Sequence, residues 1–120
     1  MPPNEGFPRR GEIYWVELSP TIGSEQSGRR PAVVLSNDDA NALSPVVTVA
    51  PTTTQPTRKM WAHEVHVPAG VGGLQEDSRV LINQVRTVAK LRVKDFIGIL
   101  PLDYVAACDQ ALKYHFALWD

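Results

Sequence analysis

The sequence predicts an α+β fold that is mainly β, a small and strongly bent barrel of antiparallel strands followed by one C-terminal helix. Six or so short apolar segments follow one another at close spacing, as is typical of antiparallel barrels rather than of parallel sheets. Only one segment, near the C-terminus, has the three- and four-residue periodicity of a convincing helix. With 120 residues, the chain has the length of one domain with one compact core.

The first strand is predicted over Glu12–Leu18, whose β-branched and aromatic residues suit a pleated, half-buried surface. The ten residues before it carry three prolines and no periodic pattern, so we interpret 1–10 as a flexible lead-in and 11–120 as the domain. Residues 19–30 are rich in Ser, Gly and charge and exceed what a tight hairpin requires, which indicates a functional loop. Pro31 then opens a buried second strand, because proline is tolerated at the first position of a strand.

The rest of the chain continues this pattern. A short helical turn is predicted over 37–43, because Asn and Asp favour helix caps. Further strands are predicted over 46–50, 63–67, 78–88 (one long strand, or two joined by a bend) and 96–100, with a single turn at 90–94. The terminal helix is predicted over 103–118, because apolar residues recur on one face: Val105, Cys108, Leu112, Phe116 and Trp119.

Composition excludes several classes of protein. No apolar run reaches the roughly eighteen residues of a membrane helix, and the first ten residues lack the apolar stretch of a signal peptide, so we expect a cytoplasmic location and no membrane partner. The single cysteine, Cys108, can form no internal disulfide, and we expect neither a metal nor a cofactor. The net charge of −1 means that any nucleic-acid site must be a local basic patch.

Five motifs occur in a fixed order along the chain. They are R-G-E-I-Y-W-V-E-L-S-P (Arg10 to Pro20), G-S-E-Q-S-G-R-R-P (Gly23 to Pro31), V-V-L-S-N, P-T-T-T-Q (Pro51 to Gln55) and Q-V-R-T (Gln84 to Thr87). Each is weak alone, but together, over roughly residues 10–118, they resemble the MazF/PemK-type toxins of bacterial toxin-antitoxin pairs. The resemblance implies an SH3-like barrel of the CcdB/PemK/MazF kind, a homodimer, and a MazE-like antitoxin whose acidic tail occupies an RNA groove.

The resemblance also implies an activity. It is sequence-specific, metal-independent cleavage of single-stranded RNA, in which the 2′-OH of the RNA attacks the adjacent phosphorus and leaves a 2′,3′-cyclic phosphate and a 5′-hydroxyl. Cleavage of mRNA in this way inhibits translation and growth. The catalytic positions of the family correspond to Arg30 and Thr53. A guanidinium offers a planar fork of donors that matches phosphate, and Pro31 restricts Arg30 to an extended backbone; we expect the Thr53 hydroxyl to orient the phosphate rather than to abstract a proton.

Eight further residues are predicted to bind the RNA or to support its site. In the family the long loop closes over the RNA strand, and a neighbouring strand supports it. The candidates are Ser24, Glu25, Gln26, Gly28, Arg29, Arg58, Gln84 and Arg86. Two alternatives stay open for Arg86, which either contacts phosphate or locks the loop. Arg58 and Lys59, with Trp61 close by, form either a phosphate and stacking site or a solvated turn.

Two positions depart from the pattern of relatives. Some members of the Kid type carry a His at the position of Ser24 and an Asp at that of Asn83, and use both in proton transfer, so the identity of the general base is open in this chain. The histidines, His63, His66 and His115, are expected on the surface or in packing.

Trp15 and Trp119 are expected in the core or at a dimer contact. The main alternative function is that of a non-enzymatic, CcdB-like toxin that binds gyrase, which would need neither Arg30 nor Thr53. A catalytically inactive RNA-binding module is the third possibility that the sequence allows.

Overall fold

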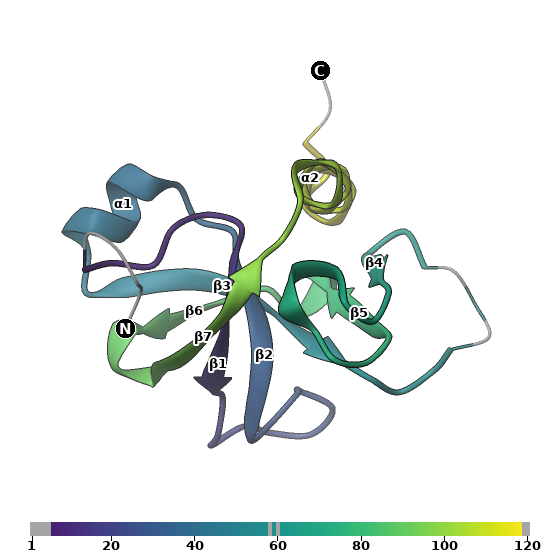
Figure 1. The fold of residues 1–120 in the computed structure, drawn as a ribbon, viewed down its shortest axis with the longest axis horizontal. Helices are drawn as coiled ribbons and strands as arrows, with labels where there is room; N and C mark the ends of the chain where they lie inside the picture. Colours follow the sequence, from purple (N-terminus) through teal and green to yellow (C-terminus); the bar gives the residue numbers. More distant parts are fainter. Residues whose placement is uncertain (1–5, 58, 60, 119–120) are drawn as a thin grey trace.

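The computed structural model describes residues 6–57, 59 and 61–118. Within them, seven strands form one antiparallel sheet that curls over on itself, and a long C-terminal helix lies across one side (Figure 1). The strands are β1 (Glu12–Glu17), β2 (Arg29–Val34), β3 (Val46–Thr53), β4 (Glu64–Val67), β5 (Ser78–Leu81), β6 (Arg86–Ala89) and β7 (Val93–Ile99). The helices are α1 (Asp38–Leu43) and α2 (Leu102–Phe116), and the single 3₁₀ turns are η1 (Val71–Gly73), η2 (Ile82–Gln84) and η3 (Lys90–Arg92). The predicted fold class, mainly β with one long C-terminal helix, is confirmed.

Strand β3 organises the sheet. The strand order is β4-β5-β3-β2-β1-β7, and β6 pairs with β3 as well. On one side, the first half of β3 pairs with β6 (Val46↔Ala89 to Val49↔Arg86) and its second half pairs with β5 (Thr52↔Val80). On its other side β3 pairs with β2. The sheet therefore divides at β3 into two parts: a barrel wing, which contains β6, and a second wing, formed by β5 and β4.

Both faces of the central strands are buried, in two separate cores. Alternating residues of β1, β2 and β3 point to opposite faces, as in any strand. One set forms the barrel core, made of Tyr14, Val16, Leu18, Ala32, Val34, Val47, Val49 and Val88. The other set joins residues of the β4–β5 wing and of α2 in the outer core, which includes Ile13, Val33, Ala50, Val65, Val80, Ile82, Cys108 and Ala111.

Two predicted strand starts are wrong. Strand β2 begins at Arg29 and not after Pro31, because β1 keeps pairing with it as far as Glu17↔Arg29, and the proline falls before the pairing with β3 begins at Ala32. Strand β7 begins at Val93, which pairs with Val16. The segment 78–88 is two strands joined by η2, which is one of the two predicted alternatives.

The predicted helix face is only partly right. Val105, Cys108 and Leu112 pack on the outer core, whereas Phe116 is 53% exposed. The reason is that α2 packs against β4 and η2, and its last turn extends beyond them. Burial raises the pKa of the Cys108 thiol to about 12, so this side chain behaves as a small apolar residue. Trp119 lies outside the described residues.

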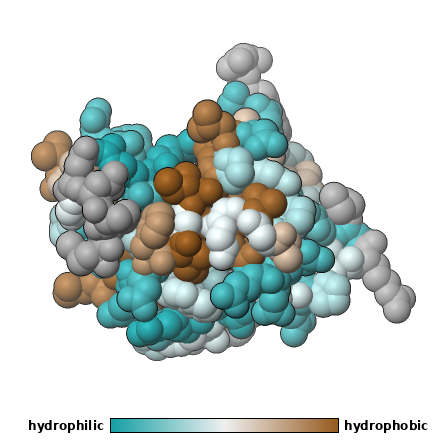
Figure 2. All heavy atoms as spheres, viewed as in Figure 1, coloured by the Kyte–Doolittle hydropathy of each residue, from teal (hydrophilic) through white to brown (hydrophobic). Residues whose placement is uncertain are grey.

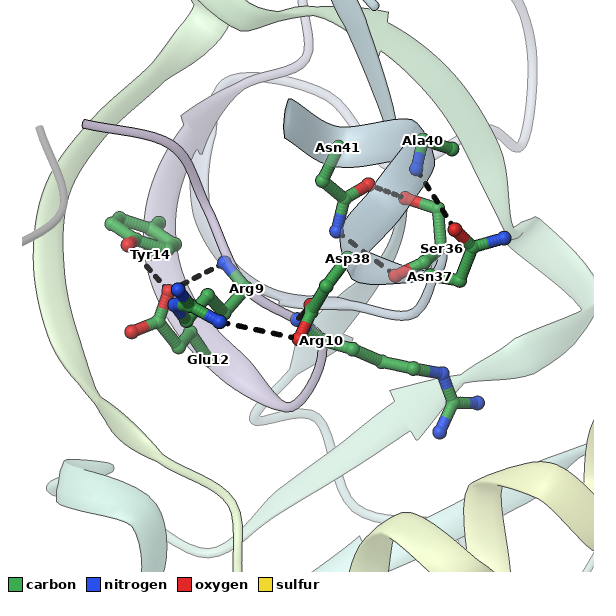
Figure 3. Close-up of polar contacts among 9 residues, drawn as sticks. All are labelled: Arg9, Arg10, Glu12, Tyr14, Ser36, Asn37, Asp38, Ala40 and Asn41. Atoms are coloured by element: carbon green, nitrogen blue, oxygen red, sulfur yellow. Dashed lines mark hydrogen bonds and ion pairs between the residues drawn. The ribbon is translucent and has the colours of Figure 1, made fainter. Parts of the chain in front are cut away.

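Arg10 ties three parts of the chain together at the entrance to β1. Its backbone N–H donates to Asp38 Oδ1 (2.7 Å) at the start of α1 (Figure 3). Its Nε donates to the Leu35 carbonyl (2.8 Å). Its Nη2 forms an ion pair with Asp109 of α2. The division into a lead-in at 1–10 and a domain at 11–120 stays a prediction, but Arg10 is joined to the barrel by these contacts.

Next to Arg10, a buried carboxylate is satisfied by local donors. Glu12 is 4% exposed, and its Oε1 accepts from the Arg9 N–H (2.6 Å) and from the Tyr14 hydroxyl (2.8 Å) (Figure 3). Burial and the neighbouring carboxylate raise the pKa of the Tyr14 phenol, which therefore stays protonated and donates. In the part of the chain that the structure describes, no helix is long and apolar enough to cross a membrane.

Substituting Tyr14→Phe tests this buried pair. The change keeps the ring, which contacts Phe96 edge-on at 5.4 Å between centroids, but removes one donor from the Glu12 carboxylate. We expect the free energy of unfolding, measured in urea, to fall by about 1–3 kcal/mol. Tyr114→Phe, at a side chain that is 56% exposed, is the matched control and should change nothing. Equal stability of the Tyr14→Phe variant and the parent protein would contradict the role of this hydrogen bond.

Candidate RNA-cleavage site

A cleft of about 470 Å³ lies where β2 and β3 extend beyond the two cores. Its walls come from the end of the β1–β2 loop, from β2 and β3, and from the segment between η1 and β5. The lining residues are Trp15, Ser27, Gly28, Arg29, Arg30, Pro31, Thr52, Thr53, Thr54, Gly73, Leu74, Gln75, Glu76, Ser78 and Ile97. Both predicted catalytic residues are among them.

Arg30 and Thr53 line the same cleft, just beyond the paired part of β2 and β3. The β2–β3 pairing runs from Val34↔Val49 to Ala32↔Pro51, and Arg30 and Thr53 are each two residues beyond its last pair. The Thr52 hydroxyl, which donates to the Pro31 carbonyl at 2.8 Å, keeps the strands together at this point. Two residues far apart in the sequence are therefore brought to one place.

Arg30 and Thr53 each keep hydrogen-bond donors that their contacts within the protein do not use. Arg30 donates from Nε to the Ser27 carbonyl (2.9 Å), which fixes the guanidinium and leaves its terminal nitrogens for a ligand. Thr53 is 4% exposed, and its Oγ1 accepts from the Gln55 N–H (3.2 Å), so the hydroxyl hydrogen is available to donate. No described acidic side chain forms an ion pair with Arg29 or Arg30. The cleft thus presents two arginines without an ion-pair partner among the described residues and a hydroxyl donor, which suit a phosphate.

The β1–β2 loop is tied down at both ends. At its base, the Leu18 N–H donates to the Gly28 carbonyl (2.9 Å), and the Gly28 N–H donates to Ser19 Oγ (2.7 Å). Farther out, the Gln26 N–H donates to Gln84 Oε1 (2.7 Å). Glu25 Oε1 accepts from the Ile22 N–H (3.1 Å) and closes a turn within the loop. The loop is therefore held at a fixed place beside Arg30.

Two arginines hold the carbonyl groups at the end of β1. Arg86 donates from Nη1 to the Leu18 carbonyl (3.2 Å), and Arg92 donates from Nη1 to the carbonyls of Glu17 and Ser19. Three successive carbonyls at the start of the loop thus receive a charged donor. The Arg86 contact is the one expected from its loop-locking alternative, and its RNA binding stays a prediction.

A second cleft, of about 230 Å³, lies between the outer part of the loop and residues 83–86. It is the small cleft, and the cleft of 470 Å³ that holds Arg30 and Thr53 is the large cleft. The small cleft is lined by Glu25, Gln26, Pro51, Asn83, Gln84, Val85 and Arg86. Gln26 Oε1 is buried there without a hydrogen-bond partner in the described part of the protein. The candidates therefore divide into two groups: Gly28 and Arg29 line the large cleft with the catalytic pair, whereas Glu25, Gln26, Gln84 and Arg86 line the small one.

The remaining candidates lie elsewhere. Ser24 is exposed in the loop and lines neither cleft. Arg58 lies outside the described residues. His63 lies beside Glu64 and stacks on Trp61, and His115 packs edge-on against Phe116 on the exposed end of α2. His66 is exposed on β4, and like His63 and His115 it lines neither the large nor the small cleft.

Sequence reasoning missed three residues of this region. Trp15, expected in the core or at a dimer contact, is 39% exposed in the large cleft and so lies outside the core. Glu76 brings a carboxylate to the same cleft from the turn before β5, and no motif signalled it. Arg92 is predicted only as part of a turn, and its loop contacts depend on the path of η3. A solvent-facing position in the strand alternation could have indicated Trp15; the other two required the fold.

The sequence matches known proteins along almost its whole length. Residues 9–116 match the family described as PemK-like, MazF-like toxin of type II toxin-antitoxin system. The chain is 41% identical over 116 residues to endoribonuclease MazF9 of Mycobacterium tuberculosis (strain ATCC 25618 / H37Rv), covering 92% of this chain and 98% of the relative. It is 38% identical over 112 residues to endoribonuclease EndoA of Bacillus subtilis (strain 168), covering 93% and 97%.

Solved structures give the same result for the fold. The crystal structure of MazF (Form-I) from Deinococcus radiodurans superposes with a TM-score of 0.82 at 28% identity, over 95% of this chain and 100% of that one. An endoribonuclease from a mycobacterial species, solved in complex with its cognate antitoxin, superposes with a TM-score of 0.78 at 23% identity, over 94% and 99%. The second similarity is one of fold alone.

The substitution Gln84→Ala tests whether η2 holds the loop. It removes the acceptor of the Gln26 N–H, so this amide should exchange its hydrogen about five-fold faster, as expected for the loss of one hydrogen bond worth about 1 kcal/mol. Hydrogen–deuterium exchange followed by NMR measures the change. Gln75→Ala, at an exposed residue on the opposite wall of the large cleft, serves as the control. Unchanged exchange at Gln26 would show that the loop is held by its base alone.

Proposed function

This chain belongs to the family of PemK-like and MazF-like toxins of type II toxin-antitoxin systems, and we propose that the 470 Å³ cleft is the site at which it cleaves single-stranded RNA as an endoribonuclease. The observation that carries the proposal is the meeting of Arg30 and Thr53 in one cleft, at the ends of β2 and β3, where no described acidic side chain forms an ion pair with the arginine. Purified protein should cut a long RNA in EDTA and leave 5′-hydroxyl ends.

The proposed reaction is a transesterification within the RNA chain itself. The 2′-oxygen of the substrate forms a bond to phosphorus and loses its proton, while the bond from phosphorus to the 5′-oxygen breaks and that oxygen gains a proton. A 2′,3′-cyclic phosphate and a 5′-hydroxyl result. Negative charge builds up on the phosphoryl oxygens in between, and donors placed there in advance lower the barrier. Arg30 supplies a planar pair of donors and Thr53 a hydroxyl, from strands whose backbone is fixed.

Loop and strand residues contribute binding rather than chemistry. Arg29 adds a second positive charge beside Arg30, and Gly28 brings the backbone of the loop to the rim of the large cleft. Gln26 and Gln84 keep the loop in place over the smaller cleft, where an adjoining nucleotide enters. Selection of the cleavage motif takes place in these two clefts. Cleavage of mRNA at this motif inhibits translation and growth.

The gyrase-binding alternative is not favoured. It would place function at the end of α2 and leave Arg30 and Thr53 without a role. The relatives that align over more than nine tenths of their length are endoribonucleases. A supercoiling assay with purified gyrase separates the two functions, because only the alternative gives inhibition in the absence of RNA.

The partners follow from the family. A cognate MazE-like antitoxin blocks the RNA site through an acidic segment, and the Arg29 and Arg30 charges are suited to bind it. Both proteins act in the cytoplasm, where their RNA substrates are found. The toxin functions as a homodimer, supported by apolar side chains gathered near the middle of one face, where β7 runs into α2 (Figure 2). Ile99 and Leu102, exposed by 63% and 86%, belong to this stretch.

Light scattering tests the oligomeric state. At micromolar concentration we expect a particle with twice the mass of one chain, because exposed apolar area of this kind is buried in symmetric dimers. Ile99→Asp should shift the particle toward the monomer, whereas Asp95→Asn, at another exposed position of β7, should not. A monomer in the parent protein would refute the dimer and leave the cleavage activity to be judged separately.

Substitutions at the catalytic pair test the chemistry. Arg30→Ala and Thr53→Ala should each reduce cleavage by about 10²- to 10³-fold, as expected for the loss of one donor to the transition state, with much smaller effects on RNA binding. The double variant should be little worse than the poorer single variant, because both side chains act on one phosphoryl group. Single-turnover cleavage rates and filter binding measure the two quantities.

Two sets of variants keep this prediction open to contradiction. Arg30→Lys should not restore the rate, because a point charge cannot replace a planar fork of donors. The variants His63→Ala, His66→Ala and His115→Ala should stay within a few-fold of the parent rate. Normal cleavage by Arg30→Ala, together with an inactive histidine variant, would assign proton transfer to a histidine and refute the catalytic roles of Arg30 and Thr53.

A further inference from the structure

We propose that Trp15 is a nucleobase-binding platform, on which a base next to the scissile phosphate stacks. The inference rests on the proposed function and adds to it a subsite for one base of the substrate. The observations that carry it are the exposure of Trp15 inside the cleft, its register against β2, and the absence of any aromatic or cationic partner for its ring among the described residues.

The fold gives Trp15 an unusual exposure for a tryptophan on a central strand. Ile13 and Trp15 point to the outer face of β1, and Tyr14 and Val16 point into the barrel core. Ile13 is covered by the outer core and is fully buried, whereas Trp15 is 39% exposed. The outer core therefore covers β1 at Ile13 but does not extend over Trp15. An exposed indole costs free energy that a ligand on its face would recover.

An irregularity in the neighbouring strand keeps this position open. Strand β7 pairs with β1 at Tyr14↔Phe96 and Val16↔Val93, with a register shift between them. Two residues of β7 therefore lie opposite Trp15 alone, which is the arrangement of a β-bulge. Bulges direct side chains at the rims of barrels and beside active sites. In this strand pair the bulge leaves Trp15 without a directly paired residue on its β7 side.

The register on the other side places Trp15 next to the end of β2, on the same face as Arg29 and on the opposite face from Arg30. Trp15 lies opposite Pro31 of β2, and Val16 lies opposite Arg30. Trp15, Arg29, Arg30 and Pro31 all line the one cleft. A base stacked on the indole therefore has its own phosphate within reach of the arginines, so one nucleotide engages both groups. Single-stranded RNA is commonly bound in this way, by an aromatic face for the base and by cations for the backbone.

Trp61 is a tryptophan of similar exposure whose ring has partners within the protein. It is 45% exposed, close to the value for Trp15. Its ring, however, already stacks on His63 at 5.5 Å between centroids, and Lys59 Nζ lies 5.1 Å from the ring centroid. Exposure alone therefore does not distinguish Trp15. The distinguishing features are its unoccupied ring and its place in the cleft.

The experiment is a mutant cycle between the indole and the bases of the substrate. The cleavage motif is first mapped on a long RNA with the parent protein. A short oligoribonucleotide with this motif, carrying a 2′-deoxy nucleotide at the cleavage position, is then made in a series of copies, each lacking one base. Dissociation constants are measured for the parent protein and for the Trp15→Ala, Trp15→Phe and Trp61→Ala variants.

We expect Trp15→Ala to weaken binding of the intact oligonucleotide by about 5- to 150-fold, the range for loss of one stacked base. For one abasic copy the same variant should bind as well as the parent, since the stacking partner is already missing. Trp15→Phe should keep most of the affinity, and Trp61→Ala should bind normally. If Trp15→Ala fails to fold, Trp15→Leu replaces it, because leucine fills the space without an aromatic face.

Three results would overturn the proposal. Unchanged affinity in the folded Trp15→Ala or Trp15→Leu variant would show that no base stacks there. An equal loss on the intact oligonucleotide and on every abasic copy would assign Trp15 a structural role. Neither result affects the proposed function, which stands while the parent protein cuts RNA in EDTA. Failure of the parent protein to cut or bind any RNA would instead refute the function and, with it, this subsite.

Discussion

The burial of β1, β2 and β3 on both faces is the constraint on which the rest of the structure depends. The barrel core takes one set of alternating side chains and the outer core takes the other. A strand buried on both faces can vary little in register, because a shift of one residue would exchange the two sets. The positions at which these strands leave the cores are fixed equally well. Arg30 and Thr53 lie at those positions, so the packing of apolar residues determines the geometry of the polar pair.

The loop beside this pair is positioned by backbone contacts. Arg86 and Arg92 donate to the carbonyls of residues 17–19, where the loop leaves β1. Hydrogen bonds to charged donors are stronger than those between neutral groups. Both arginines belong to the chain around β6 and η3, which the barrel wing brings back beside β1. The contacts that close the barrel therefore also fix the start of the loop, while the side chains of Ser19 and Glu25 hold the loop from within.

The sequence predicted what depends on local pattern. The period of α2, the cap of α1 at Asn37, β1 and the start of β3 all follow from residues close together in the chain. The predicted end of β3 at residue 50 is wrong, because pairing with β5 at Thr52 and Thr53 extends the strand to Thr53. Arg30 and Thr53 were identified through motifs of a known family, and only the pairing of β2 with β3 explains why two residues so far apart in the sequence line one cleft. Trp15 is not in the core, because alternation marks its face but not where the cover over that face ends; its predicted place at a dimer contact stays a prediction. Arg92 and Glu76 could not be found, since a turn and an ordinary loop carry no signal of the element that will lie against them.

The arrangement also explains how a protein with a net charge of −1 can hold a polyanion. Neighbouring residues on a strand point to opposite faces, so Arg29 and Arg30 direct their charges to the two sides of the end of β2. Both nevertheless line one cleft, because β2 ends there and its two faces meet at the rim. An RNA backbone that crosses this strand end passes one positive charge and then the other. Glu76 on the opposite wall adds a negative charge to the same cleft, which repels phosphate from that side. In the proposed complex the backbone would thereby be confined to the β2 side, with the phosphoryl group at Arg30 and a base on the Trp15 ring.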